Sequence, residues 1–265
     1  MRTTISVADR GFTLGDGVFD TAIAVNGRMI ARERHLDRLM DAARRIGIAI
    51  ARGRIEAAID EVLDEAPSIL RTTVTRGTAA RGLWPGEAGE PTLIVTRASW
   101  SAEMIGQPAR LVTATGRRNE SSPTSQLKTL GYLDNILAAR EAAEAGADDA
   151  LILNTRGNVA CSTIANVFIV RGNRLVTPPT SEGCLPGIVR GQVLACAHEL
   201  GLVAEEASLG ADDLLNADAV LLTNSVRLVR LATALDGRQL QPSGEGTAAF
   251  HKVLDKLRAE ISLRC

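Results

Sequence analysis

The sequence predicts a mixed α/β (α+β) fold with two domains, and two observations support this prediction. Short segments in which apolar and polar residues alternate, typical of strands, are interspersed with helical segments in which apolar residues recur every three or four positions. A polar stretch over residues 118–125, containing Pro123, is typical of a linker. We therefore expect an N-terminal domain over residues 1–117 and a C-terminal domain over residues 126–265.

Length, charge and cysteine pattern restrict the class of protein. A chain of 265 residues can bury the core of one or two domains. The formal net charge of −1 gives no electrostatic argument for binding nucleic acid or an anionic membrane. No apolar run is long enough to span a bilayer, and the first residues lack the apolar core of a signal peptide. The four cysteines show no paired spacing, which argues against a zinc site and indicates free thiols in a reducing compartment, so we expect a cytoplasmic protein.

The first half of the chain alternates between strands and helices. A glycine-rich loop precedes a strand near residue 18, and Asn26–Gly27 predicts a hairpin turn after it. Helices are expected over residues 33–48 and 55–63, and strands over residues 68–77 and 91–100. The loop between these last strands holds Arg76 and Arg81, which can either close over an anionic substrate or lie at a solvated hairpin tip.

The second half continues the same alternation. We expect a strand over 109–116, a helix ending at Gly146, and strands over 150–154 and 159–170. A hairpin over 171–179, a helix that begins near Gly187, a strand ending at Thr223–Asn224–Ser225 and a helix over 247–263 complete the prediction.

Lys128 stands out among the cations. The chain has 30 lysines and arginines, of which only three are lysines, and Lys252 and Lys256 lie in the helical tail. Lys128 stands alone mid-chain, four residues before Tyr132, the only tyrosine. A lysine amine can lose its proton near neutral pH and form an imine with a carbonyl, which a guanidinium cannot. The pattern fits a catalytic amine and, equally, a surface lysine at the start of a helix.

Three other groups have the chemistry of anion binding. The helix start at Gly187, Ile188 and Val189 can present free backbone N–H groups. Thr223, Asn224 and Ser225 offer hydroxyl and amide groups at a strand end. Arg38 lies beside the apolar stripe of the first long helix, where an arginine commonly extends its charged end to water.

Several phrases together resemble one family. They include DRGFTLGDGVFDT, HLDRL, LKTLGYLDNILA, TIANVFIV and LPGIVR, and they keep their order from about Val7 to Gly237. The sequence is similar to the class IV aminotransferases, the fold-type IV enzymes that use pyridoxal 5′-phosphate (PLP). These include branched-chain and D-amino-acid transaminases and aminodeoxychorismate lyase. The resemblance implies a smaller N-terminal and a larger C-terminal domain with a cofactor cleft between them, and at least a homodimer.

The resemblance also implies roles for single residues. Lys128 matches the lysine that forms the Schiff base with the cofactor, Arg38 the arginine at its phosphate, and Tyr132 the tyrosine near its phenolic oxygen. Gly187, Ile188 and Val189 match a backbone phosphate site, where the family usually has threonine in place of Val189. Thr223, Asn224 and Ser225 match a further phosphate contact. The expected substrate-binding residues are Phe19, Arg76 and Arg81.

Cys161 departs from the family pattern. The family usually carries a glutamate here, which keeps the pyridine nitrogen of the cofactor protonated, whereas a neutral thiol is a weak donor. Three explanations remain open: another acid substitutes, Cys161 is a thiolate, or the reaction favours elimination.

Two reactions are compatible with this pattern. The first is transamination between a branched-chain or D-amino acid and a 2-oxo acid, which we prefer because it is the common activity of the family. The alternative is 4-amino-4-deoxychorismate lyase activity, which releases 4-aminobenzoate and pyruvate. The TRGTAARG phrase, the Thr223–Ser225 stretch, the short chain and Cys161 favour this alternative.

Overall fold

The computed structural model describes residues 4–84, 86 and 89–262 and divides the chain into two compact units. The first unit comprises the chain up to Ser101 together with Leu127–Tyr132. The second comprises Ala102–Gln126 and the chain from Leu133 onward. Residues 118–125, expected as a linker, thus lie inside the second unit, and Lys128 belongs to the first.

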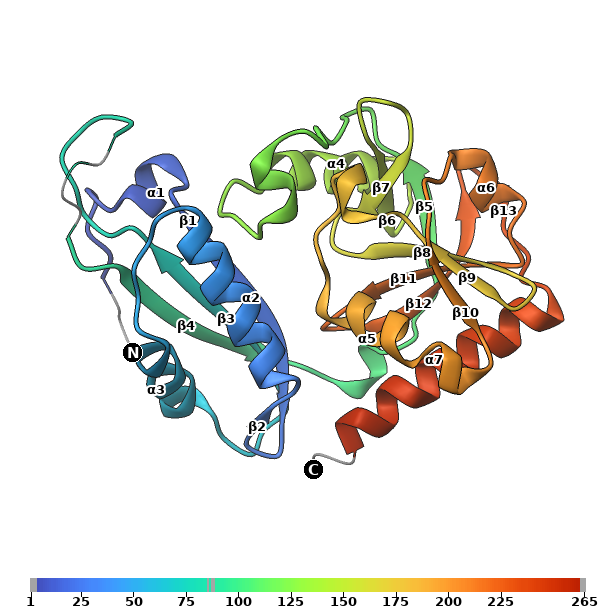
Figure 1. Ribbon diagram of the computed structural model, residues 1–265, viewed down its shortest axis with the longest axis horizontal. Coiled ribbons are helices and arrows are strands. Elements are labelled where there is room, and N and C mark those ends of the chain that lie inside the picture. Colours follow the sequence, from blue (N-terminus) through green and yellow to red (C-terminus); the bar gives the residue numbers. More distant parts are fainter. Residues whose placement is uncertain (1–3, 85, 87–88, 263–265) are drawn as a thin grey trace. The chain divides into compact units, whose positions relative to one another are not determined.

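The first unit contains an antiparallel sheet with the strand order β2-β1-β3-β4 (Figure 1). Its strands are β1 (Gly17–Val25), β2 (Arg28–Met29), β3 (Ser68–Thr75) and β4 (Thr92–Ser99). Asn26 and Gly27 have φ angles of 50° and 70°, as a type I′ turn requires, so the hairpin prediction is confirmed.

Two helices cover this sheet and close its core. Helix α2 (Arg32–Arg45) packs against β1, and α3 (Arg52–Val62) packs against β4. The apolar stripe of α2 faces this core, with Leu36, Leu39 and Ala43 buried and Met40 and Ile46 half-buried. Core side chains with at most 2% exposure come from both helices and from β3: Leu36, Leu39, Ile55, Ile59 and Leu70.

The glycine-rich segment before β1 is not the simple loop that the sequence suggested. It contains a short helix, α1 (Arg10–Leu14), whose first turn is capped by the side chain of Asp9. Gly15 ends the helix in the left-handed conformation, with φ 67°. A single turn of helix is too short for apolar periodicity to reveal it, because its stability depends on these caps.

The segment that carries Lys128 pairs with β1. The backbone N–H of Phe19 donates to the carbonyl of Lys128 at 2.8 Å, and that of Leu130 donates to the carbonyl of Gly17 at 3.0 Å. Leu127, 9% exposed, packs into the same core. These contacts over more than 100 residues of sequence assign the segment to the first unit, and local composition carries no signal for such pairing.

The second unit contains a mixed sheet with the strand order β10-β9-β8-β11-β12-β5-β6-β7, and β13 pairs with β12. Its strands are β5 (Ala109–Thr113), β6 (Asp149–Leu153), β7 (Val159–Ser162), β8 (Asn166–Arg171), β9 (Arg174–Thr177), β10 (Val203–Glu206), β11 (Ala219–Asn224), β12 (Leu228–Leu235) and β13 (Arg238–Gln239). The sheet curls, so that β7 at one end of this order also contacts β8. The expected mixed α/β fold is confirmed.

Residues 159–170, expected as one strand, form two. The chain turns between β7 and β8, where the N–H of Ser162 donates to the carbonyl of Ala165 at 2.8 Å. The buried carboxylate of Asp149 holds this turn, because it accepts hydrogen bonds from the hydroxyls of Ser162 and Thr163. Serine and threonine therefore mark a bend that strand propensity hides.

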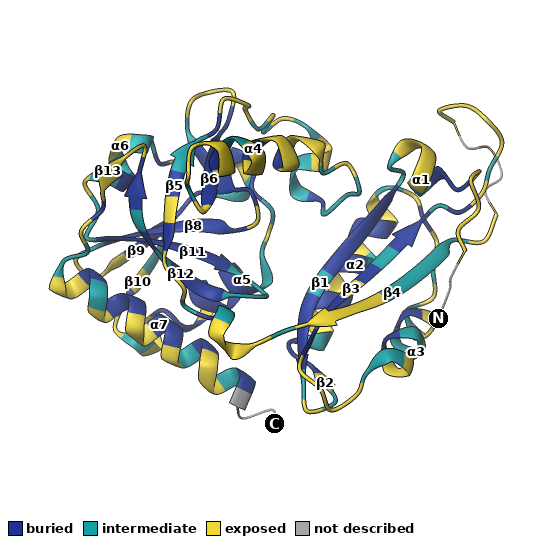
Figure 2. Cartoon of the chain, turned by 180° about the vertical axis from the view of Figure 1, so that it is seen from behind, coloured by how far each residue is buried: buried dark blue, intermediate teal, exposed yellow. Residues whose placement is uncertain are grey.

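Four helices pack on this sheet. They are α4 (Leu133–Glu144), α5 (Ile188–Cys196), α6 (Ala211–Leu215) and α7 (Gly244–Ser262). In Figure 2, β8 and β11 are buried, whereas α7 alternates between buried and exposed residues as an amphipathic helix does. The predicted C-terminal helix is confirmed up to Ser262, and Leu263 lies outside the described residues.

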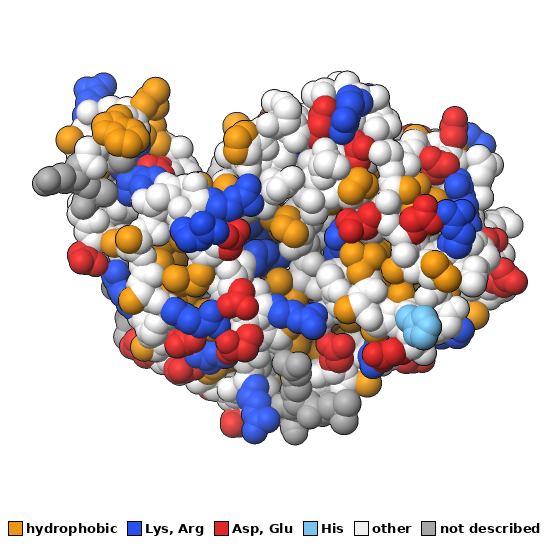
Figure 3. Space-filling view, in the orientation of Figure 1, with side chains coloured by type: hydrophobic (Ala, Val, Ile, Leu, Met, Phe, Trp, Pro, Cys, Tyr) orange, Lys and Arg blue, Asp and Glu red, His pale blue; other side chains and the backbone are white. Residues whose placement is uncertain are grey.

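The lengths and polarity of the described helices, and the charges on the surface, bear on the relation to membranes. Within residues 4–84, 86 and 89–262, each helix is too short or too polar to cross a bilayer. Positive and negative side chains are interspersed on the face shown in Figure 3, in line with the net charge of −1.

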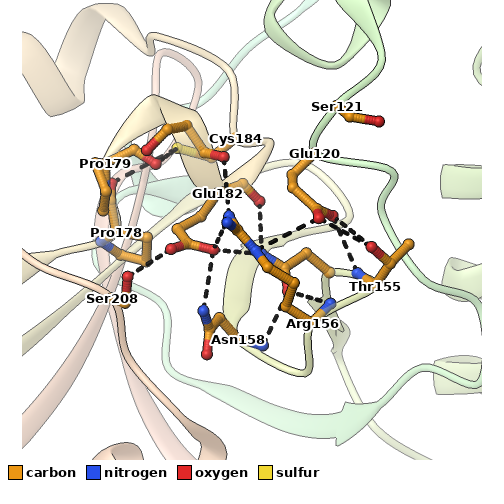
Figure 4. Close-up of polar contacts among 12 residues, drawn as sticks. Glu120, Ser121, Thr155, Arg156, Asn158, Pro178, Pro179, Glu182, Cys184 and Ser208 are labelled. Atoms are coloured by element: carbon orange, nitrogen blue, oxygen red, sulfur yellow. Dashed lines mark hydrogen bonds and ion pairs between the residues drawn. The ribbon is translucent and has the colours of Figure 1, made fainter.

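Buried polar contacts around Glu182 join three loops of the second unit (Figure 4). The Glu182 carboxylate accepts hydrogen bonds from Asn158 at 3.2 Å, from Arg156 at 2.9 Å, and from Asn154 and Ser208. Burial by itself raises the pKa of Glu182, but these partners outweigh it and lower the pKa. The network fixes the turn that leads into β7 and the segment that leads toward α5.

We predict that Glu182→Gln lowers the free energy of unfolding by about 1–3 kcal/mol, because its amide NH2 would face other donors and leave buried polar groups unsatisfied. Urea denaturation monitored by circular dichroism measures this loss. Glu199→Gln, at an exposed glutamate paired with Lys256, is the matched control and should leave the midpoint almost unchanged. Equal midpoints for both variants would contradict a structural role for the network.

Candidate functional site

Lys128 lies among aromatic side chains in the first unit. Its Nζ donates a hydrogen bond to the hydroxyl of Tyr132 at 3.0 Å and lies 4.5 Å from the ring centroid of Phe19. The rings of Phe19 and Tyr132 meet edge to face at 5.1 Å. Lys128 has no carboxylate partner in the described part of the chain. The structure thus brings together three residues that the sequence singled out and gives the amine a fixed direction.

Arg71, which the sequence analysis did not single out, also contacts Phe19. Its guanidinium carbon lies 3.6 Å from the ring centroid of Phe19, since β3 places Arg71 opposite Thr21, diagonal to Phe19. Partial desolvation lowers the pKa of Arg71. Among the described residues it has no hydrogen-bond or ion-pair partner. The sequence feature that could have indicated Arg71 is that it is the single charged residue of its strand, SILRTTVT.

Arg38 belongs to a buried charge cluster. Its Nε donates to Oδ2 of Asp20 at 2.8 Å, and Nδ1 of His35 lies 2.6 Å from Oδ1 of the same carboxylate. Burial alone would raise the pKa of Asp20, but Arg38 and His35 lower it to about 2. Arg38 therefore does not extend freely into water. Asp20 holds it from one side, and its Nη1 donates to no described residue, which leaves that nitrogen for an anion.

Arg76 and Arg81, which were expected at the substrate, lie outside the cluster around Lys128. Arg76 donates from Nε and Nη2 to Asp16, and from Nη1 to the carbonyl of Gly47 at 2.9 Å. Its donors are thus used within the first unit. Arg81 is exposed in the loop between β3 and β4, of which Pro85, Glu87 and Ala88 lie outside the described residues.

The start of α5 and the end of β11 are neighbours in the second unit. Asn166 on β8 pairs with Thr223 on β11, and its amide donates to the carbonyl of Leu185 just before the helix at 2.8 Å. Gly187 is the N-cap and provides no side chain, because a Cβ atom there would lie 2.1 Å from Oδ1 of Asn166. The backbone N–H groups of Ile188 and Val189 begin the helix uncapped.

Thr223 contributes an unsatisfied hydroxyl to this place. Its Oγ1 is buried and has no hydrogen-bond partner in residues 4–84, 86 and 89–262. The next residue, Asn224, accepts hydrogen bonds from the backbone N–H groups of Val226 and Arg227, which shapes the turn that contains Ser225. An orphan hydroxyl next to an uncapped helix start fits an oxyanion such as phosphate.

Cys161 lies on β7 in the second unit and is 8% exposed. Burial raises the pKa of its thiol, so Cys161 is a neutral thiol rather than a thiolate. Nη2 of Arg118 approaches its Sγ at 3.9 Å. Of the three explanations that the sequence left open, the thiolate is therefore disfavoured.

We predict that Asp20 contributes about 2 kcal/mol of stability that disappears in acid, because a folded-state pKa of about 2 lies below the ordinary value of 3.8. This contribution is present above pH 4 and is lost as the pH falls toward 2. Asp20→Asn should remove that part of the acid profile and be less stable at pH 7. Asp37→Asn, at an exposed aspartate on α2, the helix that carries Arg38, should keep the wild-type profile. Superimposable acid denaturation curves for wild type and Asp20→Asn would contradict the assignment.

Comparisons with known proteins identify the family of the chain. The family model described as "Amino-transferase class IV" matches residues 17–235. Over 98% of its length the chain is 33% identical to a Methanocaldococcus jannaschii protein described as a "putative branched-chain-amino-acid aminotransferase", of which it covers 93%. It is also 29% identical to a D-alanine aminotransferase of Bacillus licheniformis, over 91% of this chain and 87% of that protein.

Among solved structures, a 4-amino-4-deoxychorismate lyase from Pseudomonas aeruginosa superposes with a TM-score of 0.86 at 29% identity, over 98% of this chain and 96% of that one. The fold is that of the fold-type IV enzymes, as the sequence predicted. Similar proteins thus include transaminases and a lyase. The chain belongs to the class IV aminotransferases, a family of PLP-dependent enzymes.

Proposed function

We propose that the protein is a PLP-dependent aminotransferase that moves an amino group between an amino acid and a 2-oxo acid, with Lys128 as the residue that binds the cofactor covalently. The observation that carries this proposal is the position of Lys128. Its amine is held by Tyr132 at 3.0 Å, lies against Phe19, and has no carboxylate partner among the described residues. An amine without a neutralising partner, fixed between aromatic rings, suits imine chemistry better than surface solvation does.

The donor set in each unit fits the cofactor. Bound PLP supplies an aldehyde that takes up the amino group and a ring that withdraws electrons from the substrate. Arg38, fixed by Asp20, has a free nitrogen for a phosphate oxygen. The start of α5 offers backbone N–H groups, and Thr223 and Ser225 offer hydroxyls for the same kind of anion. Each of these groups is suited to binding and orienting a phosphate without taking part in proton transfer.

Lys128 is the group that moves protons. Once its Nζ is free, it can take the proton from the α-carbon of the amino acid and return it elsewhere. The Tyr132 hydroxyl accepts a hydrogen bond from Nζ and so limits the directions in which the amine points. Phe19 and Tyr132 exclude water from part of its surroundings, which strengthens the electrostatic contacts made there.

Arg71 is proposed to bind a carboxylate of the substrate. Its guanidinium and the Lys128 amine both pack against the ring of Phe19, and the guanidinium has no anionic partner in the described chain. Amino acids and 2-oxo acids both carry a carboxylate beside the reacting carbon. A planar guanidinium that is already partly desolvated binds such a group in a defined orientation.

The second candidate reaction is 4-amino-4-deoxychorismate lyase activity. The specific observation in its favour is the neutral thiol of Cys161, because elimination of a good leaving group needs less electron withdrawal by the ring than transamination does. Incubating the PLP-loaded protein with D-alanine, L-leucine, (R)-phenylethylamine and aminodeoxychorismate separates the two. A 2-oxo acid formed together with an aminated cofactor supports transamination, whereas 4-aminobenzoate and pyruvate support the lyase.

The proposal includes a homodimer in the cytoplasm. The resemblance to the family supports the dimer, and the cysteine pattern supports the compartment. Cys161, Cys184 and Cys196 are free thiols in the structure, and Cys265 lies outside the described residues.

We predict that Lys128→Ala keeps the fold but lowers turnover by about 10²–10⁴-fold or more, because it removes both the covalent anchor and the proton-transfer group. Borohydride reduction of the wild-type holoenzyme followed by peptide mapping should find the cofactor on Lys128. Lys252→Ala is the control, since Lys252 only donates to the carbonyl of Leu200, and it should be fully active. A label on Lys252 or Lys256 would overturn the assignment.

We predict that Arg71→Gln lowers kcat/KM for an amino acid by about 10- to 100-fold, which corresponds to roughly 1.5–3 kcal/mol for a lost hydrogen bond to a charged group. The rate with the matching amine, which lacks a carboxylate, should change little. Arg97→Gln is the control, because Arg97 on the neighbouring strand is already paired with Asp64. Equal losses with the amino acid and the amine would exclude carboxylate binding by Arg71.

A further inference from the structure

We propose that Arg118 takes the place of the family's acid at the pyridine nitrogen of PLP, donating a hydrogen bond to that nitrogen and leaving it unprotonated. The inference deepens the proposed function and rests on it, since it concerns the same cofactor. Three points carry it: a buried donor with no partner among the described residues, no free acid around Cys161 in that same part of the chain, and the chemistry of guanidinium.

The Arg118 guanidinium is fixed beside Cys161 and has an unused donor. Its Nη2 donates to the side-chain oxygen of Asn135 at 3.2 Å and approaches Sγ of Cys161 at 3.9 Å. Asn135 is held in turn, because its amide donates to the carbonyl of Thr163 at 2.6 Å. The Nε atom of Arg118 is buried and has no hydrogen-bond partner in the described part of the chain. A buried, unsatisfied donor on a charged group is costly unless a ligand satisfies it.

The nearby acid is not available to replace the missing glutamate. Asp149 and Arg118 are the charged groups that act on the Cys161 thiol. The Asp149 carboxylate already accepts hydrogen bonds from the Ser162 hydroxyl at 2.8 Å, from the Ala150 N–H at 2.8 Å and from Thr163. Its role is to hold the turn between β7 and β8. Asp149 is therefore not free to replace the missing glutamate at the pyridine nitrogen.

Replacing glutamate by cysteine also shortens the side chain. Cysteine ends at its γ atom, whereas glutamate carries its carboxylate on the δ carbon, so Cys161 reaches less far from β7 than a glutamate at this position would. The Arg118 guanidinium lies at the end of this shorter side chain, where it contacts Sγ. Because Cys161 is a neutral thiol, it neither repels the guanidinium nor competes for it as a carboxylate would.

An arginine and an acid have opposite effects on a pyridine nitrogen. A carboxylate stabilises the protonated ring, whereas a guanidinium never gives up its proton in a protein and can only donate. The nitrogen then accepts a hydrogen bond with its lone pair. The positive charge of Arg118 still stabilises electrons that move toward the ring during reaction, by electrostatics instead of protonation.

The direct test is the ¹⁵N chemical shift of the ring nitrogen in wild-type protein loaded with ring-¹⁵N-labelled PLP. We expect the shift of an unprotonated, hydrogen-bonded pyridine, well downfield of a pyridinium. A pyridinium shift in the wild type overturns the proposal and needs no variant for its interpretation. If PLP does not bind at all, or binds elsewhere than Lys128, the proposed function fails instead, so the two failures are distinguishable.

Two substitutions sharpen the result. Cys161→Glu restores the acid and should move the shift to that of a pyridinium. Arg118→Gln should shift the resonance away from the wild-type position, while the fraction of this variant that binds PLP should change little. Arg117→Gln is the matched control, because Arg117 is exposed and donates only to the carbonyl of Ala114 at 2.8 Å, and it should leave the resonance in place. Identical shifts for Arg118→Gln and wild type would also overturn the proposal.

Discussion

The candidate chemistry of the first unit depends on two backbone hydrogen bonds. The N–H of Phe19 to the carbonyl of Lys128, and the N–H of Leu130 to the carbonyl of Gly17, bind a short segment to the end of β1. Without this pairing, Lys128 and Tyr132 would have no fixed relation to Phe19. Strand β1 also carries Asp20, which binds Arg38, and it pairs with β3, which carries Arg71. This one strand therefore sets the positions of the Lys128 amine, the Phe19 ring and the two arginines.

The arginines of the chain differ in whether a carboxylate already binds their guanidinium. Arg10 and Arg76 share Asp16, and these contacts tie α1 and the end of β3 together. Arg38 is bound by Asp20 on one side only. Arg71 and Arg118 have no carboxylate partner in the described chain, and both lie beside groups with proposed roles in catalysis. Arg117 also lacks a carboxylate partner but is exposed. The functional signal is therefore the missing carboxylate together with contact to Phe19 or Cys161, and not the missing carboxylate alone.

The sequence predicted the mixed fold and most of the strands and long helices, and these predictions are confirmed because periodicity is local. It also singled out Lys128 and Tyr132, because lysine and tyrosine are rare in this chain, and the structure joins the two by a hydrogen bond. Arg71 was missed since its value arises from a diagonal contact across two strands, and Arg76 was singled out because the sequence cannot show that Asp16 uses its donors. Likewise, the ladder that places residues 127–132 in the first unit joins positions too far apart for any local pattern to reveal. The roles implied by the resemblance remain predictions for the experiments above.

The contact between Gly187 and Asn166 restricts how this protein can evolve. A methyl group at position 187 would overlap the Asn166 side-chain oxygen, which sits 2.1 Å from where that Cβ would be. A smaller residue at position 166 would relieve the overlap, but it would also release the carbonyl of Leu185 that Asn166 now binds. Neither position is therefore free to drift alone. A substitution that adds a side chain at position 187 requires a change at position 166 as well, so we expect the two positions to co-vary among related sequences.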